Sequence, residues 1–208
     1  VVCHGRSRGK AYMLPLIAEL QKSYAVLAFD FPGHGENPFG VTSIGWRESR
    51  SVGAAVEHAR SRGYSDIVLF GSSMGGASAL LWLSANPSPV VKGVIADGVF
   101  ARLHDFLLEY TARFHLPGYL SVGSIRLAER IAEFPSRQIN PAVAISSIST
   151  PGLILHGDKD PMVPASNARA LEAAAGQSFR MVIYPGRHDE PANPRLQKEV
   201  LSFIAGLR

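Results

Sequence analysis

The sequence predicts an α/β fold with a doubly wound, mostly parallel sheet that carries helices on both faces. Three observations lead to this prediction. Short apolar segments alternate with longer helix-like segments along most of the 208 residues, a pattern typical of parallel strands joined by right-handed crossovers. The apolar segments are continuous, as expected for strands that are buried on both faces. Polar residues that could carry chemistry stand directly after three of these segments.

The predicted elements divide the chain into a core and one insertion. Strands are expected at residues 1–4, 25–29, 67–70, 90–96, 152–156 and 179–184. Helices are expected at residues 11–21, 43–61, 76–86, 166–175 and 194–207. Residues 100–150 break the alternation with two amphipathic helices, at 102–114 and 123–134, on either side of Pro117 and Gly118. We therefore expect a single domain over residues 1–208, with a small helical cap insertion at 100–150 over the strand ends.

The composition agrees with one globular domain and excludes some classes of protein. Hydrophobic residues make up 46% of the chain and charged residues 18%, which is ordinary for such a domain. The net charge of +4 comes from scattered arginines without interleaved aromatic residues, so no nucleic-acid partner is expected. Cys3 is the single cysteine, which rules out an intrachain disulfide and a multi-cysteine metal site.

The location of the protein is not assigned by its sequence, although the cytoplasm is favoured. No stretch approaches the roughly 18 apolar residues of a membrane helix, and no signal peptide is present. The sequence opens at Val1, inside a predicted strand and without an initiator Met, so we expect that upstream segments have been trimmed. Membrane association through such a segment stays open, as does the oligomeric state.

The most informative motif is Gly71-Ser72-Ser73-Met74-Gly75. It follows an apolar strand-like run and precedes a helix-like run, which is the context that the G-x-S-x-G nucleophile motif requires. A serine in so sharp a turn is held in a sparsely populated backbone conformation, and flanking glycines without Cβ atoms relieve the crowding. The Ser73 hydroxyl then lies near the first amides of the following helix, which favour developing negative charge. The alternative is a glycine-rich turn without a catalytic role.

A serine nucleophile needs a base, and the base needs an orienting carboxylate. The sequence supplies both kinds of group after two later strands, in the segments His156-Gly-Asp-Lys-Asp160 and Pro185-Gly-Arg-His188. Parallel sheets place their active sites at the carboxyl ends of the strands. The order along the chain is therefore serine, acid, histidine, with each group at a predicted strand end.

Together these motifs resemble the serine hydrolases of the α/β-hydrolase superfamily, in particular the small esterase and serine aminopeptidase-like branch with a short helical cap. The resemblance covers nearly the whole chain. Residues 156–164 match the pattern H-G-x-x-D-x-x-V-P at each fixed position, which implies that Asp160 is the triad acid and His188 the base. Asp158 and Asp97 are the other candidates for the acid, interpreted as a loop residue and a structural side chain.

The resemblance also implies an oxyanion hole and a cofactor-free reaction. The two backbone N–H donors would come from Met74, which follows the nucleophile, and from Arg6, in the loop after the first strand. A backbone donor is compatible with any side chain, so an arginine at this position is acceptable. Neither a metal nor an organic cofactor is expected, and the partner is a small-molecule acyl substrate.

The expected activity is hydrolysis of a carboxylic ester or thioester through an acyl-enzyme intermediate. The same triad could serve a peptidase, an aminopeptidase, a lipase or an acyltransferase. An aminopeptidase would place an acidic residue in the cap, where Glu109, Glu129 and Glu133 are available. An alternative of another class is a non-catalytic binding module on the hydrolase fold. Ser73 argues against a dehalogenase or an epoxide hydrolase, because those enzymes need a carboxylate at this position.

Overall fold

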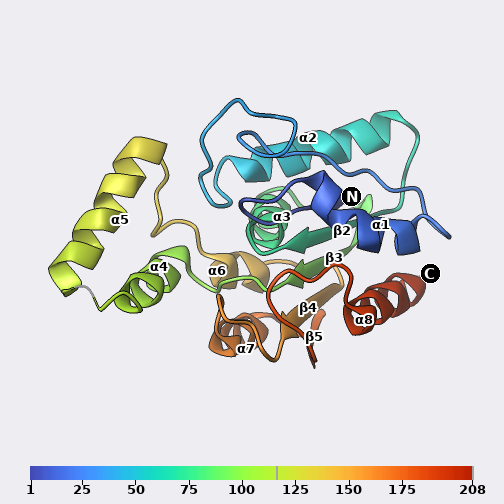
Figure 1. The fold of residues 1–208 in the computed structure, drawn as a ribbon. Coiled ribbons are helices and arrows are strands. Elements are labelled where there is room, and N and C mark those ends of the chain that lie inside the picture. The colour runs from blue at the N-terminus through green and yellow to red at the C-terminus, as the bar shows by residue number, and fades with distance from the viewer. Residues whose placement is uncertain (116, 208) are drawn as a thin grey trace.

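The computed structural model describes residues 1–115 and 117–207, and within them five parallel strands form one sheet (Figure 1). The strands lie in the spatial order β1-β2-β3-β4-β5, and each pairs in parallel with its neighbours. Their bounds are β1 Val2–Cys3, β2 Ile67–Ser72, β3 Val91–Asp97, β4 Gly152–Gly157 and β5 Phe179–Tyr184.

Helices cover both faces of this sheet, as Figure 1 shows. The two short elements at the start are η1 (Lys10–Met13) and α1 (Leu14–Leu20), and the central helices are α2 (Glu48–Ser61) and α3 (Met74–Ala85). The insertion contains α4 (Leu103–Ala112), α5 (Gly118–Ala132) and α6 (Pro141–Ser146), and the chain closes with α7 (Ala165–Ala174) and α8 (Pro194–Ala205). The predicted doubly wound α/β architecture is confirmed.

Two hydrophobic cores, one on each face, hold the helices to the sheet. On one face, residues of α2, α3, α6 and α7 pack against strand residues such as Leu69 and Val94. On the other face, residues of α1 and α8 pack against Phe70 and Ile95. Successive strand residues point to opposite faces, so each continuous apolar run supplies both cores. This explains why the strands lack the alternation of a half-exposed sheet.

The predicted strand at residues 25–29 does not form as a strand. This segment runs beside β1, but its pairing is an isolated bridge between Val2 and Ala28 and a hydrogen bond from Val2 N to Leu27 O of 2.8 Å. Further along, the Phe31 N–H donates to Nε2 of His4 and not to a backbone carbonyl. Since β1 has only two residues, the ladder ends before a second strand can propagate along it.

The connections around β1 reverse the direction in which the sheet is built. From β1 the chain passes first to the edge at Ala28 and then returns to β2 on the other side of β1. In open parallel sheets, ligands bind outside the carboxyl ends of the strands at such a switch point. The ends of β1 and β2 are therefore the place where a site is expected.

Several predicted helices differ from the observed ones at their ends. The helix predicted at 43–61 begins at Glu48, because Ile44 and Gly45 have left-handed φ values of 52° and 114° and the Glu48 carboxylate accepts hydrogen bonds from the Ser43 and Gly45 amides. The predicted helix at 123–134 begins earlier, at Gly118. The predicted helix at 11–21 divides into η1 and α1.

One helix was not expected from the sequence. Helix α6 lies in the Pro/Ser-rich part of the insertion, and it begins with Pro141 after an Asn140 side chain that accepts from the Val143 amide. Asparagine before the first turn and proline within it are recognised helix-start signals. Its side chains join the core on the α3 face, so the last part of the 100–150 insertion belongs to the core.

Helices α4 and α5 form a hairpin that is attached to this core at few points. The buried side chains are Leu103 in α4 and Ser121 and Ile125 in α5. In Figure 1 the hairpin lies at the left edge of the molecule, and α5 is separated from the sheet by α4 and α6. No helix in the described residues is both long enough and apolar enough to span a membrane.

Candidate active site

Ser73 occupies a sharp turn between the end of β2 and the start of α3. Its φ of 50° and ψ of −116° lie outside the ordinary regions for a residue with a side chain. The neighbouring glycines make this turn possible. A Cβ on Gly71 would lie 2.4 Å from the Gly76 nitrogen, and one on Gly75 would lie 2.4 Å from the carbonyl oxygen of Cys3. The backbone therefore has the strained geometry that the G-x-S-x-G motif predicts.

The end of β3 connects Ser73 to the predicted acid and base. The Ser73 N–H donates to the carbonyl oxygen of Asp97 at 2.7 Å, and Gly98 follows with a left-handed φ of 60°. A Cβ on Gly98 would lie 3.1 Å from Nδ1 of His188 and 3.6 Å from Oδ2 of Asp160. The structure thus brings all three predicted residues to the same strand ends.

His188 and Asp160 form a close pair, with 2.6 Å between Nδ1 of the imidazole and Oδ2 of the carboxylate. The other carboxylate oxygen accepts from the Met162 and Val163 amides, both at 2.8 Å. Because an ionised carboxylate can only accept, Nδ1 carries the proton in this pair. The Nε2 atom of His188 is then the basic nitrogen.

The electrostatics of this pair reflect burial and mutual attraction. The His188 side chain is 11% exposed and that of Asp160 is 1% exposed. Burial alone would lower the pKa of His188, but the hydrogen bond and the charge of Asp160 outweigh it, so the pKa of His188 is raised. Burial likewise acts against ionisation of Asp160, yet His188 and the two amides hold the pKa of Asp160 below its ordinary value.

The other acid candidates have different partners. Asp97 is buried and accepts a 3.0 Å hydrogen bond from the Tyr184 hydroxyl, and burial raises the pKa of Asp97 to about 7. Asp158 accepts from the Gly186 amide at 3.0 Å, which ties together the loops after β4 and β5. Both contacts fit the structural interpretation of these two residues.

The loop after β1 lies beside Ser73. A Cβ on Gly5 would lie 3.5 Å from the Ser73 Cβ, and the Arg8 N–H donates to the Gly5 oxygen at 3.3 Å to close a turn over residues 5–8. Arg6 stands within this turn with an exposed side chain, whereas the Met74 side chain is fully buried. The backbone of both residues is therefore near the serine, and their role as oxyanion donors stays a prediction.

One residue at these strand ends was missed by sequence reasoning. Asp189 is buried, has a left-handed φ of 56° and accepts a 2.7 Å hydrogen bond from the Ser72 hydroxyl. Its position directly after His188 was the only sequence signal. The contact joins residues 117 positions apart, which no local pattern can indicate.

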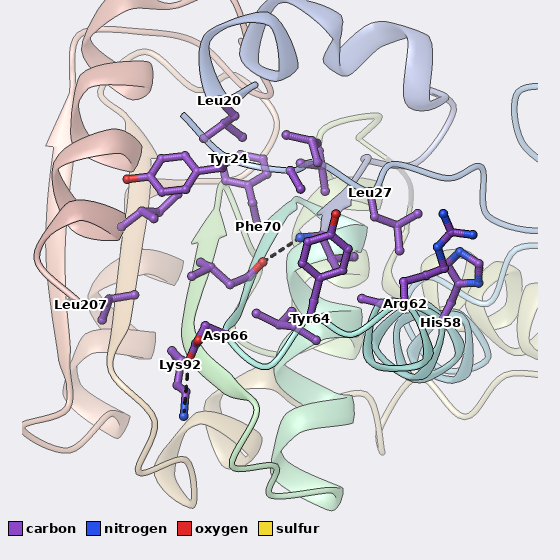
Figure 2. Close-up of a pocket in the computed structure, with 18 residues that line it drawn as sticks. Leu20, Tyr24, Leu27, His58, Arg62, Tyr64, Asp66, Phe70, Lys92 and Leu207 are labelled. Atoms are coloured by element: carbon purple, nitrogen blue, oxygen red, sulfur yellow. Dashed lines mark hydrogen bonds and ion pairs between the residues drawn. The ribbon is translucent and has the colours of Figure 1, made fainter. Parts of the chain in front are cut away.

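A cavity of about 1040 Å³ lies elsewhere, at the opposite ends of the strands (Figure 2). Its lining includes Asp66, Ile67 and Lys92, at the amino ends of β2 and β3, together with Tyr24 and Tyr64. The residues that line it do not include Ser73, Asp160 or His188. In the described part of the chain, no cluster of three His, Cys, Asp or Glu side chains could hold a metal ion.

Fold and strand-end geometry together define an α/β hydrolase. The chain belongs to the alpha/beta hydrolase family, whose sequence model matches residues 1–195. It is 26% identical over 195 residues to the uncharacterized protein YqkD of Bacillus subtilis. The aligned region covers 90% of this chain and 64% of YqkD. The chain thus spans about two thirds of the length of the curated relatives it matches.

Solved structures with the same fold include hydrolases of esters. An esterase of Pyrococcus furiosus superposes with a TM-score of 0.77 at 23% identity, covering 99% of this chain and 80% of that one. A monoacylglycerol lipase of Paleococcus ferrophilus superposes with a TM-score of 0.70 at 18% identity. That superposition covers 100% of this chain and 93% of the lipase chain. At these identities the likeness demonstrates a shared fold.

Proposed function

We propose that this chain is a serine hydrolase that cleaves carboxylic esters, or thioesters, of small molecules through Ser73, His188 and Asp160. The observation that carries the proposal is the strained turn at Ser73 beside a buried acid–imidazole pair. Gly98 lies next to this pair, since a Cβ built on it would be 3.1 Å from Nδ1 of His188, and it follows the residue that accepts the Ser73 amide hydrogen bond. A structural serine turn would need neither the backbone strain nor a 2.6 Å His188–Asp160 pair at the same strand ends.

The proposed reaction follows from the roles of these groups. The Ser73 hydroxyl oxygen bonds to the carbonyl carbon while Nε2 of His188 takes its proton, and the amides of Arg6 and Met74 stabilise the oxyanion. The tetrahedral adduct then collapses, the alcohol or thiol leaves with the proton from His188, and an acyl-enzyme remains. Water, deprotonated by His188, releases the carboxylic acid and restores Ser73. Asp160 keeps the proton on Nδ1 throughout.

We interpret the α4–α5 hairpin as a cap beside the proposed site. Arg113, at the end of α4, donates to the carbonyl oxygens of Pro161 and Met162 at 2.6 and 3.1 Å, next to the proposed acid. Arg47 donates to the Ala132 carbonyl oxygen at the end of α5 at 2.7 Å. The hairpin is thus tied to the loop that carries Asp160 and stands where it can shape substrate access.

Two of the three acidic candidates in the hairpin have partners that weaken the aminopeptidase alternative. Glu129 accepts from the backbone and hydroxyl of Ser136, and Glu133 pairs with Arg47 at 3.2 Å. These contacts give two of the three acidic candidates a structural role, and they leave Glu109, exposed on α4, as the remaining candidate. A charged amino terminus of a peptide would need a carboxylate without such partners, so the aminopeptidase alternative would depend on Glu109 alone, and we prefer the ester interpretation.

Hydrolysis of a substrate panel tests this proposal. The panel contains short-chain p-nitrophenyl esters, acyl thioesters and aminoacyl amides, and turnover is compared between the native chain and Ser73→Ala. We expect preference for the esters and a fall of at least about 10³ in kcat for the variant. Ser202→Ala, an exposed position on α8, is the matched control and should keep full activity. Equal turnover by Ser73→Ala would refute the proposal.

A further inference from the structure

Asp189 combines near-complete burial with a left-handed backbone conformation. Its side chain is almost fully buried, with 4% of the residue exposed, and its φ is 56°. Left-handed φ values are uncommon for residues other than glycine, and they persist only where surrounding contacts hold them. The contacts of Asp189 thus determine how the backbone directly after His188 is held.

The first of these contacts reaches the nucleophile turn. The Ser72 hydroxyl donates to Oδ1 of Asp189 at 2.7 Å, and both residues are buried. A hydrogen bond to a buried charged group is stronger than one between neutral groups. Since Ser72 precedes Ser73, this bond holds the nucleophile turn against the loop that carries His188.

The remaining contacts reach the loop after β1 and the short helix η1 that follows it. The Tyr12 hydroxyl donates to the Asp189 carbonyl oxygen at 2.6 Å, and Nε of Arg8 lies 3.7 Å from Oδ2. The Arg8 guanidinium also lies over the Tyr12 ring, 4.1 Å from its centroid. A Cβ on Gly5 would lie 2.9 Å from Oδ2, so the carboxylate packs directly against the turn that contains Arg6.

We infer that Asp189 is a positioning residue, whose carboxylate fixes the nucleophile turn, the base loop and the oxyanion loop relative to one another. This inference rests on the proposed serine hydrolase function. Asp189 is joined to His188 by one peptide bond, hydrogen-bonded to the residue before Ser73, and packed on the residue before Arg6. A shift among these loops would misalign the base and the oxyanion donors while leaving the substrate surface intact.

Positioning predicts a loss in kcat without a matching change in KM. For Asp189→Ala we expect kcat to fall about 10- to 100-fold, the range produced by displacements of an ångström or less, with KM within about twofold. Asp189→Asn keeps an oxygen that accepts from Ser72 and should recover most of the activity. Ser72→Ala removes the same bond from the other side. The double variant Ser72→Ala/Asp189→Ala should be little worse than the worse single variant.

The pH profile separates the charge of Asp189 from its hydrogen bond. The titratable groups that face His188 are Asp160, Asp97, His156 and Asp189 itself, with Arg8 beside Asp189. Negative charge on Asp189 helps to raise the pKa of His188, so the acid limb of kcat/KM should move to lower pH in Asp189→Asn and Asp189→Ala. In Ser72→Ala the acidic limb of the kcat/KM profile should stay at its native pH, because this variant keeps the negative charge of Asp189. A residue with only a structural role would not move the limb.

The experiment measures kcat, KM and the pH profile on a p-nitrophenyl ester, with thermal unfolding of each variant. Asp66→Asn, an exposed carboxylate at the far end of β2, is the matched control and should match the native chain. Native kcat in both Asp189→Ala and Ser72→Ala would overturn the inference, as would a loss that Asp189→Asn does not recover. If Asp189→Ala does not fold, Ser72→Ala and Asp189→Asn still decide the outcome.

The failure of this inference differs from failure of the proposed function. If Ser73→Ala is inactive while Asp189→Ala and Ser72→Ala are native-like, only the positioning role is wrong. If Ser73→Ala keeps its activity, the proposed function itself is wrong and the positioning role falls with it.

Discussion

The carboxyl ends of the strands and the α4–α5 hairpin are built in opposite ways. At the strand ends, buried polar side chains contact one another across segments that are far apart in sequence, as Ser72–Asp189 and Asp97–Tyr184 do. The hairpin instead leaves large apolar side chains in solvent, with Leu127 59% exposed and Ile131 69% exposed. The proposed catalytic residues thus lie among buried polar contacts, while the proposed cap exposes much of its apolar surface.

The contrast between the strand ends and the hairpin is tested most strongly at Asp160, where we expect the largest loss of activity. Asp160→Asn removes the charge that orients His188, and the amide group can impose the wrong tautomer, so kcat should fall by about 10⁴. The native pKa of His188 is raised above 6.5, and the neutral imidazole is the base. Activity should therefore rise with pH through a value above 6.5 in the native chain, and the residual activity of the variant should rise at lower pH.

Asp158→Asn is the matched control for this prediction. It lies two residues earlier in the same loop, and an asparagine oxygen can still accept from Gly186. Activity within about threefold of the native chain is expected. A large loss for Asp158→Asn with little loss for Asp160→Asn would reverse the assignment of the acid.

A glycine-to-alanine exchange should have opposite effects in the two regions. At Gly71 the new Cβ would lie 2.4–2.5 Å from backbone atoms of Gly75 and Gly76, so Gly71→Ala should lower the free energy of unfolding by about 3 kcal/mol or more. At Gly123, inside α5, a Cβ would meet no atom within 4 Å. Gly123→Ala should therefore raise the free energy of unfolding by about 0.5–1 kcal/mol. Chemical denaturation measures both, and equal changes would contradict the comparison.

Asp97 should make the stability of the strand ends depend on pH. Burial raises the pKa of folded Asp97 from 3.8 to about 7, so the folded state keeps a proton that the unfolded state has lost. The stability contribution of this group is therefore greatest below pH 3.8 and declines as the pH rises to about 7. Asp97→Asn does not titrate, and its Oδ1 can still accept from Tyr184.

Relative to the native chain, Asp97→Asn should gain about 2–3 kcal/mol of unfolding free energy between pH 5 and pH 8. Urea denaturation at the two pH values measures this change. Glu109→Gln, on the exposed surface of α4, is the control and should show no such gain. A pH-independent difference between Asp97→Asn and the native chain would show that Asp97 is ionised in the fold.

The smallest effects are expected on the exposed surface of α5. Leu127→Ser and Ile131→Ser each replace a mostly solvated side chain, so the unfolding free energy should change by no more than about 0.5 kcal/mol. Leu103→Ser, at a fully buried position of α4, should cost several-fold more. A loss above about 1.5 kcal/mol at residue 127 or 131 would mean that this surface is packed in solution, and the contrast between the regions would fail.

The sequence predicted local features well and long-range contacts poorly. The turn at Ser73 was predictable because its geometry depends on five consecutive residues and two glycines without Cβ atoms. The pairing of His188 with Asp160 was expected only because both follow strands and match a family pattern. Asp189 was missed, since its partners Ser72 and Tyr12 lie more than a hundred residues away.

The errors in the fold have the same origin. Residues 25–29 have the composition of a strand, but a strand also needs a partner of sufficient length, and β1 offers two residues. The late start of α2 depends on the Glu48 carboxylate reaching back to Ser43 and Gly45. In contrast, the Asn140–Pro141 start of α6 was a local signal that could have been recognised.

The most direct test of the proposed function is covalent labelling of the folded chain with a fluorophosphonate. The probe reacts with serine only where a base and oxyanion donors activate the hydroxyl. We predict one adduct per chain, located by peptide mass analysis on Ser73, no adduct in Ser73→Ala, and full labelling of Ser202→Ala. An unlabelled native chain, or equal labelling of Ser73→Ala, would contradict the assignment of Ser73 as the nucleophile.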